Sequence, residues 1–305
     1  MNQSIKLRHP NWNEDNEVVI DWFIGNESNI KVDYVNPYFQ NGSEPYPDIK
    51  IITEFCDKLF SNQQKNNRPL KFKFSGGEFT TYKDFIPLME YLKLNGAYTS
   101  ISSNGFRSID WWKQTQFLVN EYNLEYYFGE IKFDHLCSVV DTIKDFSKVS
   151  VNFNITPENF SKVDLLKKEF EKRDFQIGTR KRIHFYDVNR KPLNYSDEQK
   201  KMLKEDSDYF EITNSDNSIK RITRNEILLE HNYFRNWYCK AGVDQIVIDA
   251  KGNIWRGWCK QGGKIGNIRD EKINFPNSSI VCKTERCYNG FDLMATKTKY
   301  EPDDL

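Results

Sequence analysis

Leu70-Lys71-Phe72-Lys73-Phe74-Ser75-Gly76-Gly77-Glu78 is the stretch that decides the fold, because a strand-like pattern runs directly into a turn of two glycines and an acid. Leu70, Phe72 and Phe74 alternate with polar residues, and period-two alternation places each set on one side of a β-strand. A helix-like segment follows at residues 82–94. The stretch therefore predicts a strand, a loop where α/β sheets bind ligands, and a helix.

The same unit recurs along the first two thirds of the chain. Strands are predicted at residues 18–25, 70–75, 98–104, 124–129, 149–156 and 175–185, with helices at 49–59, 82–94, 109–119, 135–146 and 159–172. Alternation of strands and helices at this spacing predicts a parallel sheet of βα units, either open or curved into a barrel.

Polar residues occupy one face of several of these strands. They are Lys71, Lys73 and Ser75; Ser102 and Asn104; Glu125 and Tyr127; Ser150, Asn152, Asn154 and Thr156; and Arg180, Arg182 and His184. Unpaired polar groups are costly to bury, so an interior this polar is not a dry core. The pattern favours an open barrel whose lumen is wet or holds a polar ligand. A sheet with one solvated face is the alternative.

Composition limits the classes of protein to consider. The 305 residues are 38% hydrophobic, which allows a sizeable core, and 44 Lys+Arg balance 44 Asp+Glu, so net charge indicates neither a nucleic-acid partner nor a membrane surface. No apolar run has the length of a membrane span, and residues 1–10 lack a signal-peptide core. We expect a cytoplasmic chain whose six cysteines are reduced thiols or metal ligands.

The loop after the first predicted strand, Gly25–Val35, carries the most specific signal. With cysteine at Ser28, Val32 and Val35 it reads C-N-x-x-C-x-Y-C, which resembles the iron–sulfur signature of the radical S-adenosylmethionine (SAM) superfamily. Gly76-Gly77-Glu78-Phe79 resembles the Gly-Gly-Glu-Pro motif of the same superfamily, with phenylalanine in place of proline. These two motifs lie in the order that the superfamily uses, with the polar strand end at 102–105 after them.

The resemblance implies a partial (β/α)6 barrel over residues 1–195. In active members three cysteines bind a [4Fe-4S] cluster, which cleaves SAM to a radical. Carried over to this chain, the cofactor-binding residues are Gly76, Gly77, Glu78, Ser102, Asn104 and Asn152. The cluster positions are degenerate: valine has no lone pair and a serine hydroxyl is a hard donor, whereas iron–sulfur clusters require soft thiolates.

A second signal lies in the tail. Cys239, Cys259, Cys282 and Cys287 fall within fifty residues and flank a predicted hairpin at 246–258, the number of cysteines that a closed tetrathiolate site needs. Their order resembles the SPASM/twitch extension of radical SAM proteins, here predicted as a connecting helix and small β-rich domain at 196–305. The resemblance implies one auxiliary [4Fe-4S] cluster. Structural zinc and reduced core thiols are the alternatives.

Together these features predict a radical SAM family protein that lacks the cysteines of the SAM cluster. Such a degenerate member would bind SAM, a small-molecule or peptide substrate, or a partner such as an active paralogue, without radical chemistry. One alternative is a zinc-stabilised, non-catalytic interaction module. Others are a cysteine-substituted form of an active radical SAM modifying enzyme, or an enzyme that uses SAM as an ordinary methyl donor. The sequence identifies neither the substrate nor the oligomeric state.

Overall fold

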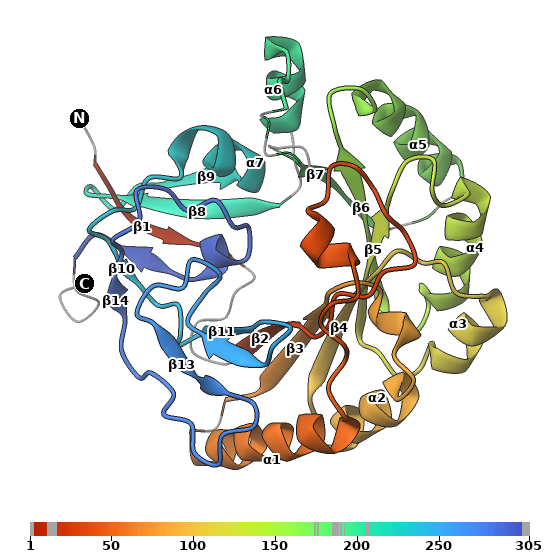
Figure 1. The fold of residues 1–305 in the computed structure, drawn as a ribbon. Helices are drawn as coiled ribbons and strands as arrows, with labels where there is room; N and C mark the ends of the chain where they lie inside the picture. The colour runs from red at the N-terminus through yellow and green to blue at the C-terminus, as the bar shows by residue number, and fades with distance from the viewer. Residues whose placement is uncertain are drawn as a thin grey trace. The chain divides into compact units, whose positions relative to one another are not determined.

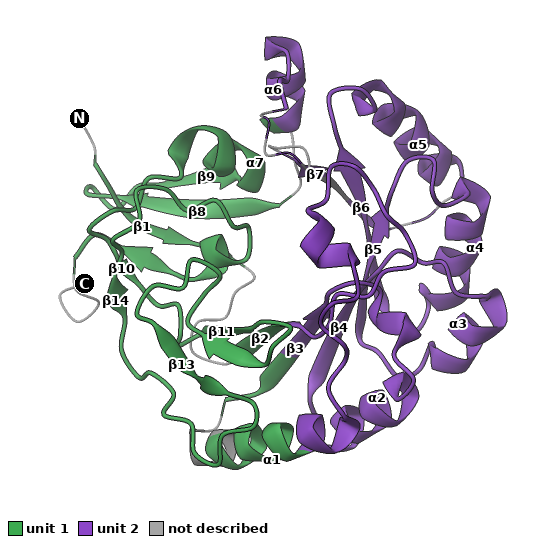
Figure 2. Ribbon diagram, in the orientation of Figure 1, with its two compact units in different colours: residues 1–22, 54–71, 204–305 green, residues 23–53, 72–203 purple. Residues whose placement is uncertain are grey.

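A computed structural model describes residues 3–10, 17–66, 68–173, 175, 177–184, 189, 191, 193–204 and 208–300. The chain forms two compact units, coloured separately in Figure 2. Unit 1 comprises Met1–Trp22, Glu54–Lys71 and Lys204–Leu305, and unit 2 comprises Phe23–Thr53 and Phe72–Leu203. The predicted domain division at residue 195 stays a prediction. Among the described residues, no helix combines the length and the apolar character needed to cross a bilayer.

Unit 2 is built on a parallel sheet, as predicted. Its strands follow one another in sequence order: β3 (Leu70–Ser75, in this unit from Phe72 on), β4 (Tyr98–Ser103), β5 (Glu121–Tyr126), β6 (Lys148–Ile155) and β7 (Gly178–Ile183). The pairs β4–β5, β5–β6 and β6–β7 are all parallel. β5 begins three residues before the predicted strand, because Glu121 and Tyr122 already pair with β6. Phe185, at the end of the last predicted strand, lies outside the described residues.

Helices alternate with these strands and lie along one side of the strand layer (Figure 1). They are α2 (Phe85–Leu94), α3 (Ile109–Thr115), α4 (Phe133–Ile143) and α5 (Phe160–Lys172). Two further helices, α1 (Ile49–Asn66) and α6 (Asp197–Lys204), cross the unit boundaries. Two short 3-10 turns are η1 (Pro37–Gln40) and η2 (Phe79–Thr81). Leu88 and Met89 of α2 and Val139 and Val140 of α4 are fully buried. These apolar stripes form the core of unit 2 on the helical side of the sheet.

Unit 1 is mainly antiparallel. Its six-stranded sheet has the order β14 (Ile280–Val281), β10 (Tyr238–Cys239), β15 (Lys297–Thr298), β1 (Ser4–Arg8), β8 (Tyr209–Asn214) and β9 (Ile219–Thr223). Its other strands lie in the order β13 (Lys264–Asn267), β12 (Asn253–Trp255), β11 (Gln245–Ile248) and β2 (Val18–Phe23). The predicted hairpin is confirmed as β11–β12. The unit also contains α7 (Arg224–Glu226), the π-helical turn η3 (Ile227–His231) and η4 (Asp292–Met294).

Strand β1 was not predicted, because its partners lie far away in the sequence. Leu7 pairs with Ile212 on one side and Lys297 on the other. Ile5 and Leu7 are buried, while the residues between and beside them are half-buried or exposed. Five residues with two apolar side chains are too short a pattern to predict a strand without knowledge of its neighbours.

The Gly76-Gly77 turn after β3 lies against the backbone of the loop that begins at Gly25. Both glycines have positive φ, at 108° and 48°. A Cβ on Gly76 would overlap the carbonyl oxygen of Gly25, and one on Gly77 would overlap the carbonyl oxygen of Glu27. The amide of Glu78 donates to that same Glu27 carbonyl at 2.8 Å. The glycines are therefore required by the close approach of the chain's own loop, since any side chain would displace it.

Candidate functional site

Glu78 connects the ends of two neighbouring strands of unit 2. Its side chain is 1% exposed. One carboxylate oxygen accepts from the hydroxyl groups of Thr80 (2.5 Å) and Ser103 (2.8 Å), and the other accepts from the amide of Asn104 (2.7 Å). Burial raises the pKa of Glu78, and the hydrogen bonds from Thr80, Asn104 and Ser103 oppose that shift. The carboxylate thus acts first as an internal link between the β3 and β4 loops.

Two of these partners, Thr80 and Ser103, were missed by sequence reasoning. Alternation along the strand had placed Ser102 with Asn104 in the site, but the residue that reaches Glu78 is Ser103. Strand β4 ends at Ser103. Beyond that residue, the alternation of side chains along a strand no longer determines which of them lie on the same face. The predicted cofactor residue Asn104 contacts the other loop through its side chain, which donates to Asn29 Oδ1 at 2.8 Å.

Two side-chain amides hold the Gly25–Val35 loop. Asn26 is fully buried: its Nδ2 donates to the Tyr38 carbonyl at 2.6 Å, and its Oδ1 accepts from the Glu44 amide at 2.7 Å. Gln40 binds the opposite end of the loop. Its Oε1 accepts from the Val32 amide at 3.0 Å, while its Nε2 donates to the carbonyls of Val32 (3.0 Å) and Val35 (2.9 Å). The loop therefore has its own hydrogen-bonded support.

The residues at the predicted cluster positions do not fit an iron–sulfur cluster. Val32 is buried and Val35 is half-buried, and both offer only methyl groups. The Ser28 hydroxyl accepts from the Ile30 amide at 3.2 Å. A [4Fe-4S] cluster needs soft thiolate ligands, so these side chains cannot replace them. The backbone groups of Val32 and Val35 are bound instead by the amide of Gln40.

A cavity of about 530 Å³ lies beside this loop. It is lined by Glu27, Ser28, Asn29, Pro45, Tyr46, Pro47, Asp48, Thr81, Tyr82 and Lys83. The Tyr46 hydroxyl donates to the Glu78 carbonyl at 2.9 Å, and burial raises the pKa of Tyr46 to about 12, so this hydroxyl stays protonated. Its volume is in the range of small-ligand pockets, and it offers carboxylates, an ammonium group and aromatic rings.

The predicted polar face of the sheet is present and is largely paired within itself. Glu125, whose side chain is 8% exposed, accepts from Asn152 (2.9 Å), Asn154 (3.1 Å) and Arg182 (2.9 Å). Asn152, a predicted cofactor residue, is therefore engaged with Glu125. The side chain of Arg180, on the same predicted face, lies outside the described residues. Mutual pairing explains how so polar a face can be buried.

His184 and Tyr34 lie at one end of this polar face. Since the Asn154 side chain donates through its nitrogen to Glu125, its oxygen faces His184 Nε2 at 2.9 Å and accepts from it. Burial lowers the pKa of His184 to about 3, with Arg182 acting in the same direction, so the ring is neutral. The ring of Tyr34 packs 4.9 Å from that of His184. The Tyr34 hydroxyl is buried without a hydrogen-bond partner among the described residues.

The four tail cysteines lie in unit 1, and three of them, Cys239, Cys282 and Cys287, are buried. The net pKa of Cys287 is raised to about 12: burial is the main cause, the Lys297 charge opposes the shift, and the charges of Asp292, Cys239 and Cys259 add to it. Burial and Asp292 likewise raise the pKa of Cys259 to about 12, with contributions from Cys239 and Cys282. The thiols are thus near enough to influence one another, but no three of their sulfur atoms lie within 4.8 Å of one another, so the structure does not assemble the closed site predicted from the sequence. Thiols are nevertheless the donor type that zinc and iron–sulfur clusters use.

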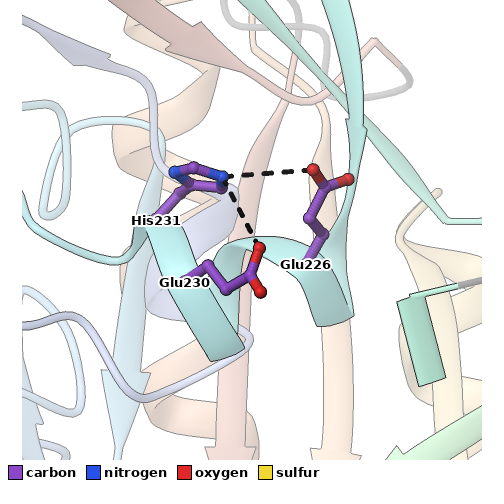
Figure 3. A group of neighbouring side chains, drawn as sticks. All are labelled: Glu226, Glu230 and His231. Carbon is purple, nitrogen blue, oxygen red and sulfur yellow. Dashed lines mark ion pairs between the residues drawn. The ribbon is translucent and has the colours of Figure 1, made fainter. Parts of the chain in front are cut away.

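A second group of possible metal ligands is formed by Glu226, Glu230 and His231 (Figure 3). His231 Nε2 lies 4.0 Å from a carboxylate oxygen of each glutamate. The Lys204 ammonium already binds Glu230, and both Glu230 and His231 are exposed. This group was not predicted from the sequence. Its geometry is that of a surface ion-pair cluster, an arrangement that contributes little to stability.

Comparison with known proteins identifies solved structures that share the fold. No protein-family model and no curated protein matches the sequence. Native anSMEcpe with bound AdoMet (SAM) and Cp18Cys peptide shares the fold with a TM-score of 0.56 at 15% identity, over 84% of this chain and 78% of that one. A histidine-tagged form of anSMEcpe with bound AdoMet gives 0.55 at 14% identity, over 83% and 75%. These are radical SAM enzymes, and the likeness establishes the α/β fold with its parallel sheet.

The role of Gln40 leads to a first prediction. Gln40→Ala removes three hydrogen bonds from the loop and should cost about 2–3 kcal/mol of its local stability, at roughly 1 kcal/mol for each bond. Amide hydrogen exchange at Val32 should accelerate accordingly, and adding a metal chelator should change nothing. Gln114→Ala, on the exposed side of α3, is the matched control. Unchanged exchange at Val32 in the Gln40 variant would contradict this role.

The half-buried, neutral His184 predicts a dependence on pH. Its pKa is lower in the folded chain (about 3) than the usual 6.5, so the unfolded chain takes up a proton first as the pH falls. Stability should therefore be lost between about pH 6.5 and 3, by roughly 1.4 kcal/mol per pH unit for this group. His184→Gln should flatten this dependence in urea titrations at pH 7 and pH 5. His231→Gln, at a half-exposed side chain, should leave it as in the wild type.

Proposed function

We propose that this chain is a member of the radical SAM superfamily that has lost the SAM-cleaving cluster and acts by binding. Unit 2 binds a small polar ligand without radical chemistry, and SAM is the first candidate. Unit 1 holds one metal centre through Cys239, Cys259, Cys282 and Cys287. The established fold supports the superfamily assignment.

The observation that carries the proposal is the way the Gly25–Val35 loop is held. Three residues without thiols stand at the cluster positions, and the Gln40 side chain binds the backbone between two of them. A cluster would be held by side-chain thiolates, so a loop without it loses a cross-link between the three positions. The hydrogen bonds preserve the loop where a cluster would otherwise organise it. This supports retained binding over a collapsed or unrelated loop.

The cavity beside Ser28 supports a ligand-binding role for unit 2. It adjoins the loop, and its wall includes Tyr46, which is bound to the backbone of Glu78. Glu27 and Asp48 supply negative charge, and Lys83 supplies positive charge. A zwitterionic amino-acid group, such as the methionyl part of SAM, matches this mixture of charges. A peptide substrate is the second candidate, and anSMEcpe is known with a bound peptide.

The metal in unit 1 is either an auxiliary [4Fe-4S] cluster or zinc. When bound, a cluster would supply a redox-active group, and zinc would supply structural cross-linking alone. Both would replace the protons of the four thiols, three of which are buried. A zinc form would agree with the interaction-module alternative, so the identity of the metal separates the two hypotheses.

Metal analysis of anaerobically purified protein tests the centre in unit 1. We expect iron with sulfide, or stoichiometric zinc, in the wild type. The double variant Cys282→Ala/Cys287→Ala should lose this metal, because a closed site needs all four ligands. Cys56→Ala and Cys137→Ala, at buried thiols elsewhere, are the controls. Metal that is retained in the double variant, or absent from the wild type, would contradict the proposal for unit 1.

Calorimetric titration with SAM tests unit 2. The wild type should bind SAM saturably, and SAM should remain uncleaved after addition of a strong reductant. Ser28→Trp fills the cavity and should weaken binding at least tenfold, since the indole occupies space that the ligand needs. Leu94→Trp introduces the same side chain at an exposed position of α2. Equal affinity in the two tryptophan variants would place the ligand elsewhere, and no heat in the wild type would exclude SAM.

A further inference from the structure

Lys297 is the charged residue of unit 1 whose position is least expected. It lies in β15 and is 1% exposed, although lysine is rarely buried without compensation. Its ammonium donates to the backbone carbonyls of Asp292 (2.6 Å), Ala295 (2.9 Å) and Leu293 (3.4 Å). These carbonyls satisfy its hydrogens but carry no formal charge. A buried ammonium in such surroundings requires negative charge nearby.

The strand register places Lys297 beside the cysteines. In the antiparallel pair of β10 and β15, Lys297 is directly opposite Cys239, and opposite residues project on the same face of a sheet. Burial lowers the pKa of Lys297, but the charges of Cys239, Cys287, Asp292 and Cys282 raise it, and the net shift is upward. Three of the four predicted metal ligands therefore contribute to the field at this one ammonium.

Asp292 supplies the only formal negative charge in this group when the thiols are protonated. It is 3% exposed, and its two oxygens accept from the amides of Trp258 and Cys259, each at 2.8 Å. Asp292 thus positions the turn that carries Cys259. When four thiolates bind a metal, their charge exceeds that of a divalent ion, and the centre becomes anionic beside the Asp292 carboxylate. A cation in the same region would then offset part of this negative charge.

Arg256 is the other cation that acts on Cys239. Its guanidinium donates to the carbonyls of Ala241 (3.1 Å) and Ser278 (3.0 Å). Burial lowers the pKa of Arg256, and the charge of Cys239 raises it. Arg256 is only half-buried, so solvent screens its charge more than that of Lys297. Lys297 is therefore the more deeply buried of these two cations, and its charge interacts with three of the four cysteines.

We infer that Lys297 is the buried counter-charge of the four-cysteine metal centre, a positioning residue that tightens metal binding and raises the reduction potential of an iron–sulfur cluster held there. This inference rests on the metal centre proposed for unit 1. Net charge near a cluster is one of the main determinants of its potential. Groups just outside the ligands commonly change metal affinity by about 10–100-fold.

The test uses the full-length, metal-loaded protein and two substitutions of opposite sign. Lys297→Gln removes the positive charge but keeps N–H donors for the carbonyls. Asp292→Asn removes the negative charge and keeps an acceptor oxygen. Metal retention is measured by competition with a chelator, and a redox titration gives the midpoint potential if iron is bound. Lys297→Gln should weaken retention by about 10–100-fold and lower the potential. Asp292→Asn should shift the potential upward; only its potential is compared, because the Asn amide nitrogen cannot accept from the Trp258 or Cys259 amide and the turn that carries Cys259 changes.

Lys283→Gln is the matched control, because Lys283 follows Cys282 directly but is exposed to solvent. It removes the same charge beside a ligand and should have little effect, since solvent screens exposed charges. Equal results for Lys297→Gln and wild type would overturn the inference while leaving the metal centre standing. Shifts in the same direction in the Lys297 and Asp292 variants would also overturn it, because damage to packing does not depend on the sign of the charge. A wild type without metal would instead overturn the proposal for unit 1.

Discussion

The close passage of the Gly25–Val35 loop over the Gly76-Gly77 turn is the constraint on which unit 2 depends. The carbonyl of Glu27 accepts from the Glu78 amide, and that contact leaves no room for a side chain at Gly77. Glu78 then fixes the end of β4 through Ser103 and Asn104. One backbone hydrogen bond and one buried carboxylate thus bring three separate loops together at the carboxyl ends of the strands, the usual place for ligands in parallel sheets.

This geometry gives Gly76, Gly77 and Glu78 a structural role. Read from the sequence, Gly76, Gly77 and Glu78 are groups that await a ligand. In the structure they first satisfy the needs of the protein, because a buried carboxylate with four hydrogen bonds is already stabilised as a structural element. Ligand binding and loop packing are compatible here, because the cavity beside Ser28 adjoins the loop from which these contacts are made.

Sequence patterns predicted what depends on local periodicity and missed what depends on distant partners. β3 was predicted to the residue because Leu70, Phe72 and Phe74 alternate without interruption. β1 was missed because its partners are about two hundred residues or more away, in β8 and β15. Motif spacing predicted Glu78 and Asn104 for one site, and the two are hydrogen-bonded, while their role in cofactor binding stays a prediction. Gln40 was not predicted, because a single glutamine in a polar loop has no distinguishing pattern until its amide is seen between the backbone groups of Val32 and Val35.

The two units differ in how their buried polar and charged side chains are paired. On the sheet of unit 2, Glu125 pairs with Arg182 and accepts from the amides of Asn152 and Asn154, and His184 is held neutral. Around the cysteines of unit 1, Lys297 and Asp292 are both buried, yet their side chains bind backbone groups rather than each other. Separately held charges cost more than a direct ion pair. The metal centre proposed for unit 1 would add the negative charge of its thiolates to this environment.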